Sequence, residues 1–557
     1  MMTPLKSFLH WEKKTPGNTF LRQPIAGQWH TYSFAAAGDE VRRIAAALHE
    51  LKLPAESRVA ILSKNCAHWI MADLAIMMSG HVSVPVYPTL SSAGIRELLT
   101  HSEAAVIFIG KLDDFDSQKD GISAALIRIS FPLYGAREGL QWDELLRKHQ
   151  PATALPAPRH DAVATVMYSS GTTGTPKGVM LTHEAFGYVG DRVKTHLKMR
   201  DRERFFSYLP LSHIAERALM EMTALATGSS ISFAESLDRF QENLQHEKPT
   251  IFGGVPRIYA KFHEAILKKI PQGKLDRLLN IPLLRTLIRR TIRAKLGLSH
   301  ARVIVTGAAP MPVTLLEWFK RLGIPIREVY GMTENTAFSH ANFLDIRIGT
   351  VGQPWPDVEA KLGEDGEVLV RHPALMKGYF RDAEITARVF TADGFLRTGD
   401  QGTIDSEGFL TIIGRVKDQF KTDKAKFVAP APIEMKLLSN PDIEQVCVVG
   451  LGLPQPIALM VLAGNAKEKN ADEISAGIAR TVHDVNRGLE GYEQVEKAVV
   501  VRDGWTLENG LLTPSLKLKR NEIEKMYSPK YKTWYEKDSL IVWDHHTGND
   551  PRPAARA

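Results

Sequence analysis

The sequence predicts an α/β protein with a large N-terminal domain of mostly parallel sheets, a small β-rich subdomain and a small α+β domain at the C-terminus. Strand-like and helix-like segments alternate through the first three hundred residues, paired short strands follow from about Gly352, and a separate apolar pattern begins after Gly414. Alternating strands and helices are typical of parallel sheet, because each helix returns the chain to the start of the next strand. A chain of 557 residues also exceeds one ordinary core. We therefore expect an N-terminal domain over residues 1–413, with its β-rich subdomain at about 352–413.

The first elements read as βαβ units. The expected elements are a strand at 58–62, a helix at 69–78, a strand at 82–86, a helix at 94–101 and a strand at 105–110. The apolar stretch from Trp69 to Val86 contains Asp73 and His81, so it predicts a buried helix and strand and not a membrane span.

A glycine-rich segment is the most informative part of the chain. Residues 168–183 read YSSGTTGTPKGVMLTH and follow an apolar run that predicts a buried strand. Its glycines, hydroxyls and single cation, Lys177, suit a polyphosphate better than a flexible linker. The segment is not a Walker A loop, because Pro176 precedes the lysine and Gly178 stands where Ser or Thr would bind magnesium. We expect an extended segment, with the next helix starting at Thr182 as N-cap.

Further polar segments follow predicted strands, at the sheet edge where α/β proteins bind ligands. A strand at 303–306 enters Gly307, Ala308 and Ala309, whose small side chains let a flat ring lie against the backbone. A strand also precedes Thr398-Gly399-Asp400, in which the aspartate suits ribose hydroxyls, although such a tripeptide is usually only a turn.

The third such segment follows a short strand at 328–330. It contains Gly331, Met332, Thr333 and Glu334. Tyr330 can stack on a base, Thr333 can donate to a phosphate and Glu334 can bind a hard cation.

The last third of the chain changes character. The expected hairpins pair 359–362 with 367–371 and 403–404 with 409–413. The elements expected after Arg415 are a helix at 433–438, strands at 445–450 and 459–463, a helix at 472–486 and a strand at 495–501. These predict a separate α+β domain, followed by a frayed tail at 546–557.

Composition sets the broad class. Hydrophobic residues make up 44% and charged residues 24% of the chain, which excludes a disordered protein. Cys66 and Cys447 cannot form a disulfide framework or a zinc site, and the N-terminus MMTPLKSFLHWEKK lacks a signal-peptide core. We expect a cytoplasmic protein, at most peripheral at the inner face of a membrane, with no nucleic-acid partner.

The net charge of +7 is partly local. Residues 268–302 contain ten Lys or Arg and one acid, interleaved with Leu and Ile, which predicts a basic amphipathic helical hairpin broken at Pro282. This hairpin could lie on an anionic membrane or receive an apolar acidic substrate. The alternative, which the sequence slightly favours, is a solvated face over an ordinary core.

Together these motifs resemble those of AMP-forming acyl-CoA synthetases, in the superfamily that includes peptide-synthetase adenylation domains and beetle luciferases. The matching segments are YSSGTTGTPKGV, YLPLSHIAER (208–217), GAAPMP (307–312), YGMTEN (330–335), TGDQG (398–402), GRVKDQFK (414–421) and LTPSLKLKR (512–520). YLPLSHIAER, TPSLKLKR and FVAPAPIE (427–434) look most like long-chain fatty acyl-CoA synthetases.

The resemblance implies a two-step reaction that uses ATP, Mg²⁺ and CoA. A medium- to long-chain fatty acid attacks the α-phosphate of ATP to give acyl-AMP and pyrophosphate, and the CoA thiol then displaces AMP. It further implies that residues 418–545 form a mobile domain that rotates between the two steps about a hinge at 414–417, with Lys417 in the hinge.

The resemblance also assigns roles to the candidate residues. The implied phosphate loop comprises Ser169, Ser170, Gly171, Thr173, Gly174, Thr175 and Lys177. Thr172 and Glu334 would flank Mg²⁺. The implied nucleotide pocket comprises Gly307, Ala308, Ala309, Tyr330, Gly331, Met332, Thr333, and Asp400 and Arg415 at the ribose.

Two further residues carry the implied chemistry. Lys517 would bridge the carboxylate and the α-phosphate, although it could be a surface lysine beside Lys519 and Arg520. His213 would line the junction of the nucleotide and acyl pockets, or be a satisfied core histidine. We expect the acyl wall to lie in residues 205–217 and 251–259.

One segment departs from the family pattern. Relatives often carry glycine after the hinge, where this chain reads Thr422-Asp423-Lys424-Ala425-Lys426. Ala425 could narrow the approach of CoA, and Asp423 adds negative charge near an anionic ligand. Two alternatives therefore stay open: an acyl-AMP ligase that delivers to a carrier protein in trans, and a non-catalytic nucleotide- or fatty-acid-binding protein of this fold.

Overall fold

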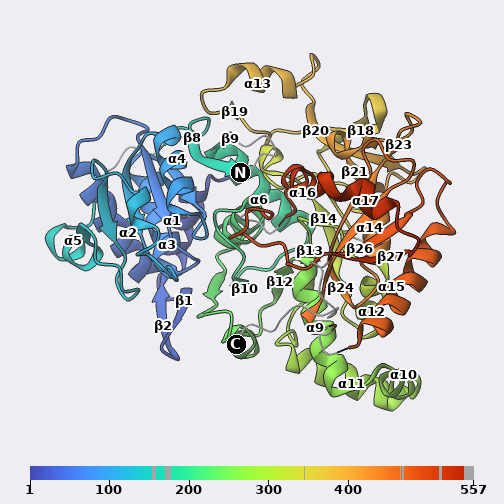
Figure 1. Cartoon of the computed structure of the whole chain (residues 1–557). Coiled ribbons are helices and arrows are strands. Elements are labelled where there is room, and N and C mark those ends of the chain that lie inside the picture. Colours follow the sequence, from blue (N-terminus) through green and yellow to red (C-terminus); the bar gives the residue numbers. More distant parts are fainter. Residues whose placement is uncertain are drawn as a thin grey trace.

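The computed structural model describes residues 1–153, 158–169, 177–343, 345–464, 466, 469–513 and 517–544, with the side chain of Ser169 left out. Within these residues the chain forms two large sheets of eight and nine strands, two four-stranded sheets and one two-stranded sheet (Figure 1). The expected tail at 546–557 lies outside the described residues. No described helix combines the length and the apolar character needed to cross a membrane.

The first sheet has the strand order β19-β9-β8-β4-β3-β5-β6-β7. Its strands are β3 (Arg58–Leu62), β4 (Val82–Val86), β5 (Ala104–Ile109), β6 (Ile127–Ser130), β7 (Leu140–Gln141), β8 (Val163–Ser169), β9 (Lys177–Thr182) and β19 (Gly378–Tyr379). Strands β3 to β8 pair in parallel, whereas β9 and β19 pair antiparallel. The expected βαβ units are confirmed, and every residue of helix α3 (Ala67–Met78) is buried.

The second sheet has the order β16-β15-β14-β13-β12-β10-β11-β1-β2. Its strands are β1 (Thr19–Ile25), β2 (Gln28–Ser33), β10 (Arg204–Ser207), β11 (Ser230–Phe233), β12 (Ile251–Gly254), β13 (Val303–Thr306), β14 (Arg327–Tyr330), β15 (His340–Ala341) and β16 (Gln353–Pro354). The strands from β1 to β14 in this order are parallel. Ligand-binding loops are therefore expected at the shared carboxyl edge.

The remaining helices of this part connect and cover the two sheets. They are α1 (Pro4–Lys14), α2 (Phe34–Glu50), α4 (Ser92–Ser102), α5 (Trp142–Lys148), α6 (His183–His196), α7 (Thr223–Thr227), α8 (Phe240–Glu247), α9 (Pro256–Lys269), α10 (Gln272–Asn280), α11 (Pro282–Lys295) and α12 (Val313–Arg321). In Figure 1, α2, α3 and α5 lie on the left, while α10 and α11 lie at the lower edge of the molecule.

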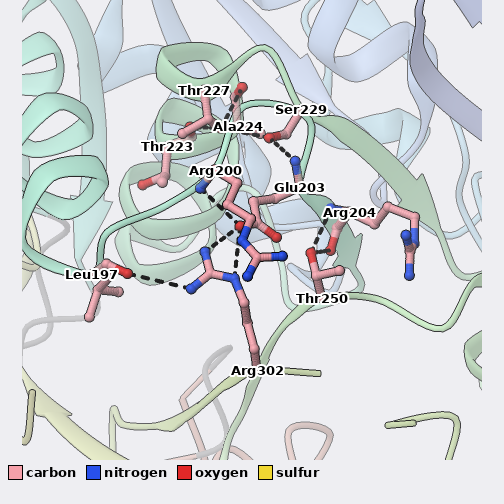
Figure 2. Close-up of polar contacts among 10 residues, drawn as sticks. All are labelled: Leu197, Arg200, Glu203, Arg204, Thr223, Ala224, Thr227, Ser229, Thr250 and Arg302. Carbon is pink, nitrogen blue, oxygen red and sulfur yellow. Dashed lines mark hydrogen bonds and ion pairs between the residues drawn. The ribbon is translucent and has the colours of Figure 1, made fainter. Parts of the chain in front are cut away.

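A buried polar network locks the amino ends of four strands of the second sheet (Figure 2). The Glu203 carboxylate, 3% exposed, accepts a hydrogen bond from Arg302 Nε at 2.8 Å. The backbone N–H of Glu203 donates to Ser229 Oγ at 2.8 Å, and that of Arg204 donates to Thr250 Oγ1 at 2.8 Å. Because these residues stand at the starts of β10, β11, β12 and β13, the network fixes the relative positions of the four strands.

The third sheet forms the β-rich subdomain, with the antiparallel order β17-β18-β20-β21. Its elements are β17 (Glu359–Leu362), β18 (Glu367–Arg371), β20 (Leu396–Ile404), β21 (Leu410–Arg415) and the helix α13 (Ala383–Val389). Both expected hairpins are confirmed. The placement of Asp400 after a strand was wrong: β20 continues through it, because Gly399 at φ +69° and an irregularity after Gln401 keep the strand paired with β21.

The C-terminal part contains a sheet in the order β24-β25-β26-β27 with apolar clusters on both faces. Its elements are β22 (Phe420–Lys421), β23 (Phe427–Val428), α14 (Pro430–Leu437), β24 (Ile443–Val449), β25 (Ile457–Leu462), α15 (Ala471–Asn486), β26 (Lys497–Val500), α16 (Arg520–Tyr527), α17 (Tyr531–Tyr535) and β27 (Ile541–Trp543). The expected helices and strands are present, and α16, α17 and β27 are additional. In Figure 1 these elements lie on the right.

Candidate functional site

The glycine-rich segment connects β8 to β9. The two strands form an antiparallel hairpin in which Ser169 is opposite Lys177. Residues 170–176 lie outside the described residues; they include Ser170, Gly171, Thr172, Thr173, Gly174 and Thr175. The expected extended conformation is confirmed for 177–182. Thr182 is the N-cap of α6, as predicted, with its hydroxyl accepting from the backbone N–H of Ala185 at 3.1 Å.

Lys177 and Glu334 meet at one tyrosine. The Lys177 ammonium lies 5.6 Å from the ring centre of Tyr379, and the hydroxyl of that ring donates to Glu334 Oε1 at 2.8 Å. Burial, and then the Glu334 carboxylate, raise the pKa of Tyr379, so its proton stays on the hydroxyl and holds the carboxylate in place. One cation and one anion therefore lie at the end of the β8–β9 hairpin where the glycine-rich segment connects the two strands.

Glu334 lies in a tight turn after β14, the 3₁₀ helix η3 (Thr333–Asn335), and is 7% exposed. The backbone N–H of Met332 donates to Asn335 Oδ1 at 2.8 Å and closes this turn. Gly331 is required here, because a Cβ would lie 2.5 Å from the backbone carbon of Ala337. The glycine therefore allows the close return of chain that points Glu334 inward.

Asp400 is held by two partners. Tyr330 Oη donates to Asp400 Oδ2 at 2.6 Å, and Arg415 Nε lies 2.9 Å from Asp400 Oδ1. Asp400 and Arg415 are opposite each other in the β20–β21 ladder. The Asp400 charge is the main reason that the pKa of Arg415 is raised, while burial is the main reason for the raised pKa of Tyr330. Tyr330, expected to stack on a base, is thus also tied to the aspartate.

Gly307, Ala308 and Ala309 follow β13, directly beside the strand that ends in Tyr330. Because β13 and β14 are adjacent and parallel, the two loops leave the same edge of the sheet. A Cβ at Gly307 would lie 2.8 Å from the carbonyl oxygen of Val329, and Ala308 adopts a left-handed φ of +66°. The small residues therefore allow close packing of the two loops, while the flat surface for a ring stays a prediction.

Lys517 reaches this cluster from the C-terminal part of the chain. Part of the residue is exposed to solvent, while desolvation by the surrounding protein is the main cause of its lowered pKa. Arg415 lowers that pKa further, and Asp400 and Glu334 raise it, so the lysine lies within electrostatic reach of all three. The structure thus brings together a cation and two carboxylates from three separate segments.

His213 lies within electrostatic range of the same lysine. Burial first, and then Lys517, lower the pKa of His213 to about 4, so the imidazole is neutral at neutral pH. Its Nδ1 accepts from the backbone N–H of Ala215 at 3.2 Å. The histidine stands at the start of the π-helix η2 (Ala215–Met222), a rare geometry that often marks functional sites.

Lys417 lies in the short turn η5 (Val416–Asp418), directly after β21. It lines a groove of about 330 Å³ with Phe420, Leu451 and Arg520. Among the described residues, no hydrogen bond or ion pair joins Lys417 to Tyr330 or Asp400.

The sequence did not predict the contacts of two residues, Tyr379 and Arg217. Tyr379 lies outside every motif, so the sequence offered no signal for it. Arg217, expected in the acyl wall, is instead fully buried and bonds to Asp73, to Ser83 Oγ at 2.8 Å and to Thr165 Oγ1 at 2.7 Å. It links η2 to the first sheet, and its position in a known motif could have suggested only a special environment.

The expected acyl wall contains a dense aromatic group. The rings of Tyr208 and Phe252 stack at 5.9 Å, and Phe252 contacts both Tyr259 and Phe262. The hydroxyl of Tyr208 donates to the carbonyl of Gly253 at 2.9 Å, which satisfies its polar end. Within the described residues no group of three His, Cys, Asp or Glu side chains could hold a metal ion.

Comparison with known proteins follows the same division of the chain. Residues 8–380 match the AMP-binding enzyme family, and residues 417–539 match the AMP-binding enzyme C-terminal domain.

Curated relatives match along nearly the whole chain. Long-chain-fatty-acid–CoA ligase FadD15 of Mycobacterium bovis is 30% identical over 586 residues, which cover 95% of this chain and 96% of that protein. Long-chain-fatty-acid–CoA ligase 6 of Rattus norvegicus is 29% identical over 580 residues, which cover 91% of this chain and 82% of that protein.

Solved structures share the fold. The anthranilate CoA ligase AuaEII, in complex with anthranoyl-AMP, has a TM-score of 0.78 at 20% identity over 95% of this chain and 98% of that one. The o-succinylbenzoate CoA synthetase of Bacillus subtilis, in complex with the acyl-adenylate intermediate OSB-AMP, has a TM-score of 0.73 at 23% identity over 94% and 98%.

Proposed function

The chain belongs to the AMP-binding enzyme family, and from this premise we propose that it is an ATP-dependent fatty acid–CoA ligase. It activates a medium- to long-chain fatty acid to acyl-AMP with release of pyrophosphate, and then forms the CoA thioester. The observation that carries this proposal is the bonded Tyr330–Asp400–Arg415 cluster, with Lys517 within electrostatic range of Asp400, Arg415 and Glu334.

The first step needs cations at the α-phosphate, because attack by a carboxylate brings two anions together. We assign this task to Lys517, which comes from the C-terminal part of the chain and lies within electrostatic range of Asp400 and Glu334. The lowered pKa reflects incomplete hydration, which strengthens its attraction to an incoming anion. Lys177, at the β8–β9 hairpin, would meet the departing pyrophosphate.

Glu334 fits a ligand of Mg²⁺. Mg²⁺ is usually held by one or two carboxylates together with substrate phosphates, and Glu334 supplies one oriented carboxylate beside Lys177. Thr172 is the second expected ligand. When bound, the ion would neutralise charge on the leaving pyrophosphate.

The nucleoside would lie at the carboxyl edge of β13 and β14. The loop at Gly307, Ala308 and Ala309 and the ring of Tyr330 would enclose adenine. Asp400 would accept from the ribose hydroxyls, with Arg415 holding the carboxylate in place.

The acyl chain would enter beside His213. A neutral imidazole fits the junction between a charged nucleotide and an apolar chain, since it adds no charge to the apolar side. The aromatic group around Tyr208 and Phe252 supports a long apolar acyl group as the substrate class.

We further propose that CoA is the acceptor and that the enzyme works in the cytoplasm beside a membrane. Delivery to a carrier protein is the weaker alternative, because the full-length curated relatives carry the name of CoA ligases. A protein that only bound nucleotide or fatty acid would not need the charged cluster around Lys517, which we assign to the reaction at the α-phosphate.

The test is a ladder of carboxylic acids from short to long, with pyrophosphate release and acyl-CoA formation measured separately. We expect both products with the longer acids. Pyrophosphate without acyl-CoA would favour transfer to a carrier, and the absence of both products while ATP binds would overturn an enzymatic role.

A further inference from the structure

Helix α11 presents leucines to solvent. All four large aliphatic side chains of residues 281–287 are exposed, namely Ile281 at 49%, Leu283 at 86%, Leu284 at 37% and Leu287 at 59%. All seven residues of this segment are exposed, and its leucines and isoleucine form the densest run of exposed large hydrophobic side chains among the described residues. Such a run on a helix marks an interaction surface.

The leucines point away from the core by helical geometry. Ile292, 6% exposed, marks the inner face of α11. Leu283 and Leu287 lie half a turn away from it around the helix, on an outer face that they share with Arg290 and Ala294 at spacings of four, three and four residues. Among the described residues, no apolar cluster includes these two leucines.

Arginines fix this orientation. Arg289 Nε donates to the carbonyl of Arg321 at 2.9 Å, and Arg293 Nη1 donates to the carbonyl of Gly323 at 2.8 Å. Both bonds tie α11 to the end of α12, so the helix cannot roll to bury Leu283. In Figure 1 the pair α10 and α11 stands at the lower edge, opposite α13.

The two helices are strongly basic. Their exposed cations are Lys274, Arg277, Arg285, Arg290 and Lys295, of which Arg290 lies on the outer face with the leucines. The only acid of residues 268–302, Asp276, is already paired with Arg321 at 2.7 Å. A helix pair that combines outward leucines with exposed cations matches a layer that is apolar inside and anionic outside.

We propose that α10 and α11 dock on the surface of an anionic lipid bilayer, with Leu283 and Leu287 inserted below the headgroups and the cations paired with phosphates. The helices share one apolar cluster with the aromatic side chains Tyr259 and Phe262 next to the expected acyl wall. Docking would therefore bring the membrane close to the region that receives a fatty acid. The docking itself does not depend on the proposed reaction.

The experiment is co-sedimentation of the full chain with vesicles of phosphatidylglycerol and phosphatidylcholine in equal parts, or of phosphatidylcholine alone. We expect binding to the anionic vesicles that weakens with salt. The double variant Leu283→Ser/Leu287→Ser and the triple variant Lys274→Gln/Arg285→Gln/Arg290→Gln should each reduce the partition coefficient by about tenfold or more. Leu237→Ser is the matched control, because Leu237 is 84% exposed elsewhere, and it should bind like the wild type.

Two results would overturn the proposal: no binding of the wild type to anionic vesicles, or binding that both multiple variants retain. Sedimentation velocity without lipid provides a further check. Self-association that the leucine variant abolishes would assign this surface to a second copy of the chain instead. Adenylation of a medium-chain acid supplied in solution without vesicles and the melting temperature should stay unchanged in every variant, which excludes misfolding as the cause of lost binding.

Discussion

Arg257 of α9 forms an ion pair with Glu444 of β24, and the pair connects the large N-terminal part of the chain to the C-terminal sheet. Arg257 Nη2 lies 2.5 Å from Glu444 Oε1, with both side chains partly exposed to solvent. Such a pair contributes about 1 kcal/mol at most. It nevertheless bridges the two parts in the same arrangement that brings Lys517 to Asp400 and Glu334.

Removing this bridge should shift the balance between the two half-reactions. We expect Arg257→Ala to slow pyrophosphate release by about two- to fivefold, since up to ~1 kcal/mol of bias toward this arrangement is lost. Pre-steady-state measurement of each half-reaction checks this. Arg388→Ala, which breaks the surface pair with Glu384 inside the N-terminal part, is the control and should change neither step.

Lys517→Ala should lower the rate of acyl-AMP formation by ~10²-fold or more, because the charge on the α-phosphate loses its cation. The pKa of Lys517 is lowered, so the ammonium is lost at a lower pH than in an ordinary lysine. Adenylation should therefore fall on the alkaline side as pH rises through that pKa. Lys519→Ala is the matched control, and a Lys517→Ala enzyme with full adenylation would contradict the assignment.

Tyr330→Phe removes the hydrogen bond to Asp400 and leaves the Arg415 pair intact. We expect the KM for ATP to rise by about tenfold, consistent with the loss of one hydrogen bond to a charged group. Steady-state kinetics with ATP varied gives the answer. An unchanged KM would show that Asp400 is positioned by Arg415 alone.

Ala425 adopts a φ of +56°, a left-handed conformation that favours glycine, in the turn between β22 and β23. Ala425→Gly should relieve strain of about 1 kcal/mol, less the entropy that glycine adds to the unfolded chain. Because Ala425 is expected to narrow the approach of CoA, we expect the glycine variant to accelerate the thioester step. Adenylation, which does not involve CoA, should stay the same. Ala26→Gly provides the comparison, because Ala26 has a φ of +49° in the distant β1–β2 turn and its replacement should leave both steps unaltered.

Glu203→Gln should lower the free energy of unfolding by about 3 kcal/mol, because it leaves the Arg302 charge without its carboxylate. Burial alone would raise the pKa of Glu203, but hydrogen bonds from Arg302 and its neighbours outweigh burial and lower it. Because the folded-state pKa of Glu203 is lowered, its ionised carboxylate stabilises the fold above the unfolded-state pKa. That stabilisation is lost as pH falls through the folded-state pKa. The melting temperature of the wild type should therefore drop more steeply in acid than that of the variant.

A surface pair serves as the control for that measurement. Arg371→Gln breaks an exposed pair with Glu359 and should change the free energy of unfolding by less than about 1 kcal/mol. Equal losses in the two variants would contradict a special role for the Glu203 network.

The helices and strands of the fold were predicted from local patterns in the sequence. The Thr182 cap and strands such as β3, β4 and β13 follow from periodicity and short-range hydrogen bonding, which act over a few residues. Strand β20 was placed incorrectly because its pairing with β21 overrides the turn preference of Thr398-Gly399-Asp400.

The candidate site was predictable only where a motif marked it. Tyr379 contacts Glu334 across 45 residues, and Arg217 contacts Asp73 across 144, and no local preference encodes such contacts. The structure brings Tyr330, Asp400 and Arg415 together, while their roles toward nucleotide stay predictions.

The Glu203–Arg302 network lies at the amino ends of β10 to β13, whereas the candidate ligand loops leave the carboxyl ends of the same sheet. The amino ends of the strands thus fix the sheet, while the carboxyl ends carry the candidate ligand loops. A sheet whose register is set from one side tolerates changes in length and sequence at the other. Libraries that vary the exposed Ala309 and Pro310, and keep Gly307 and Ala308, should therefore yield a high fraction of folded proteins, which makes this edge a place to alter nucleotide binding.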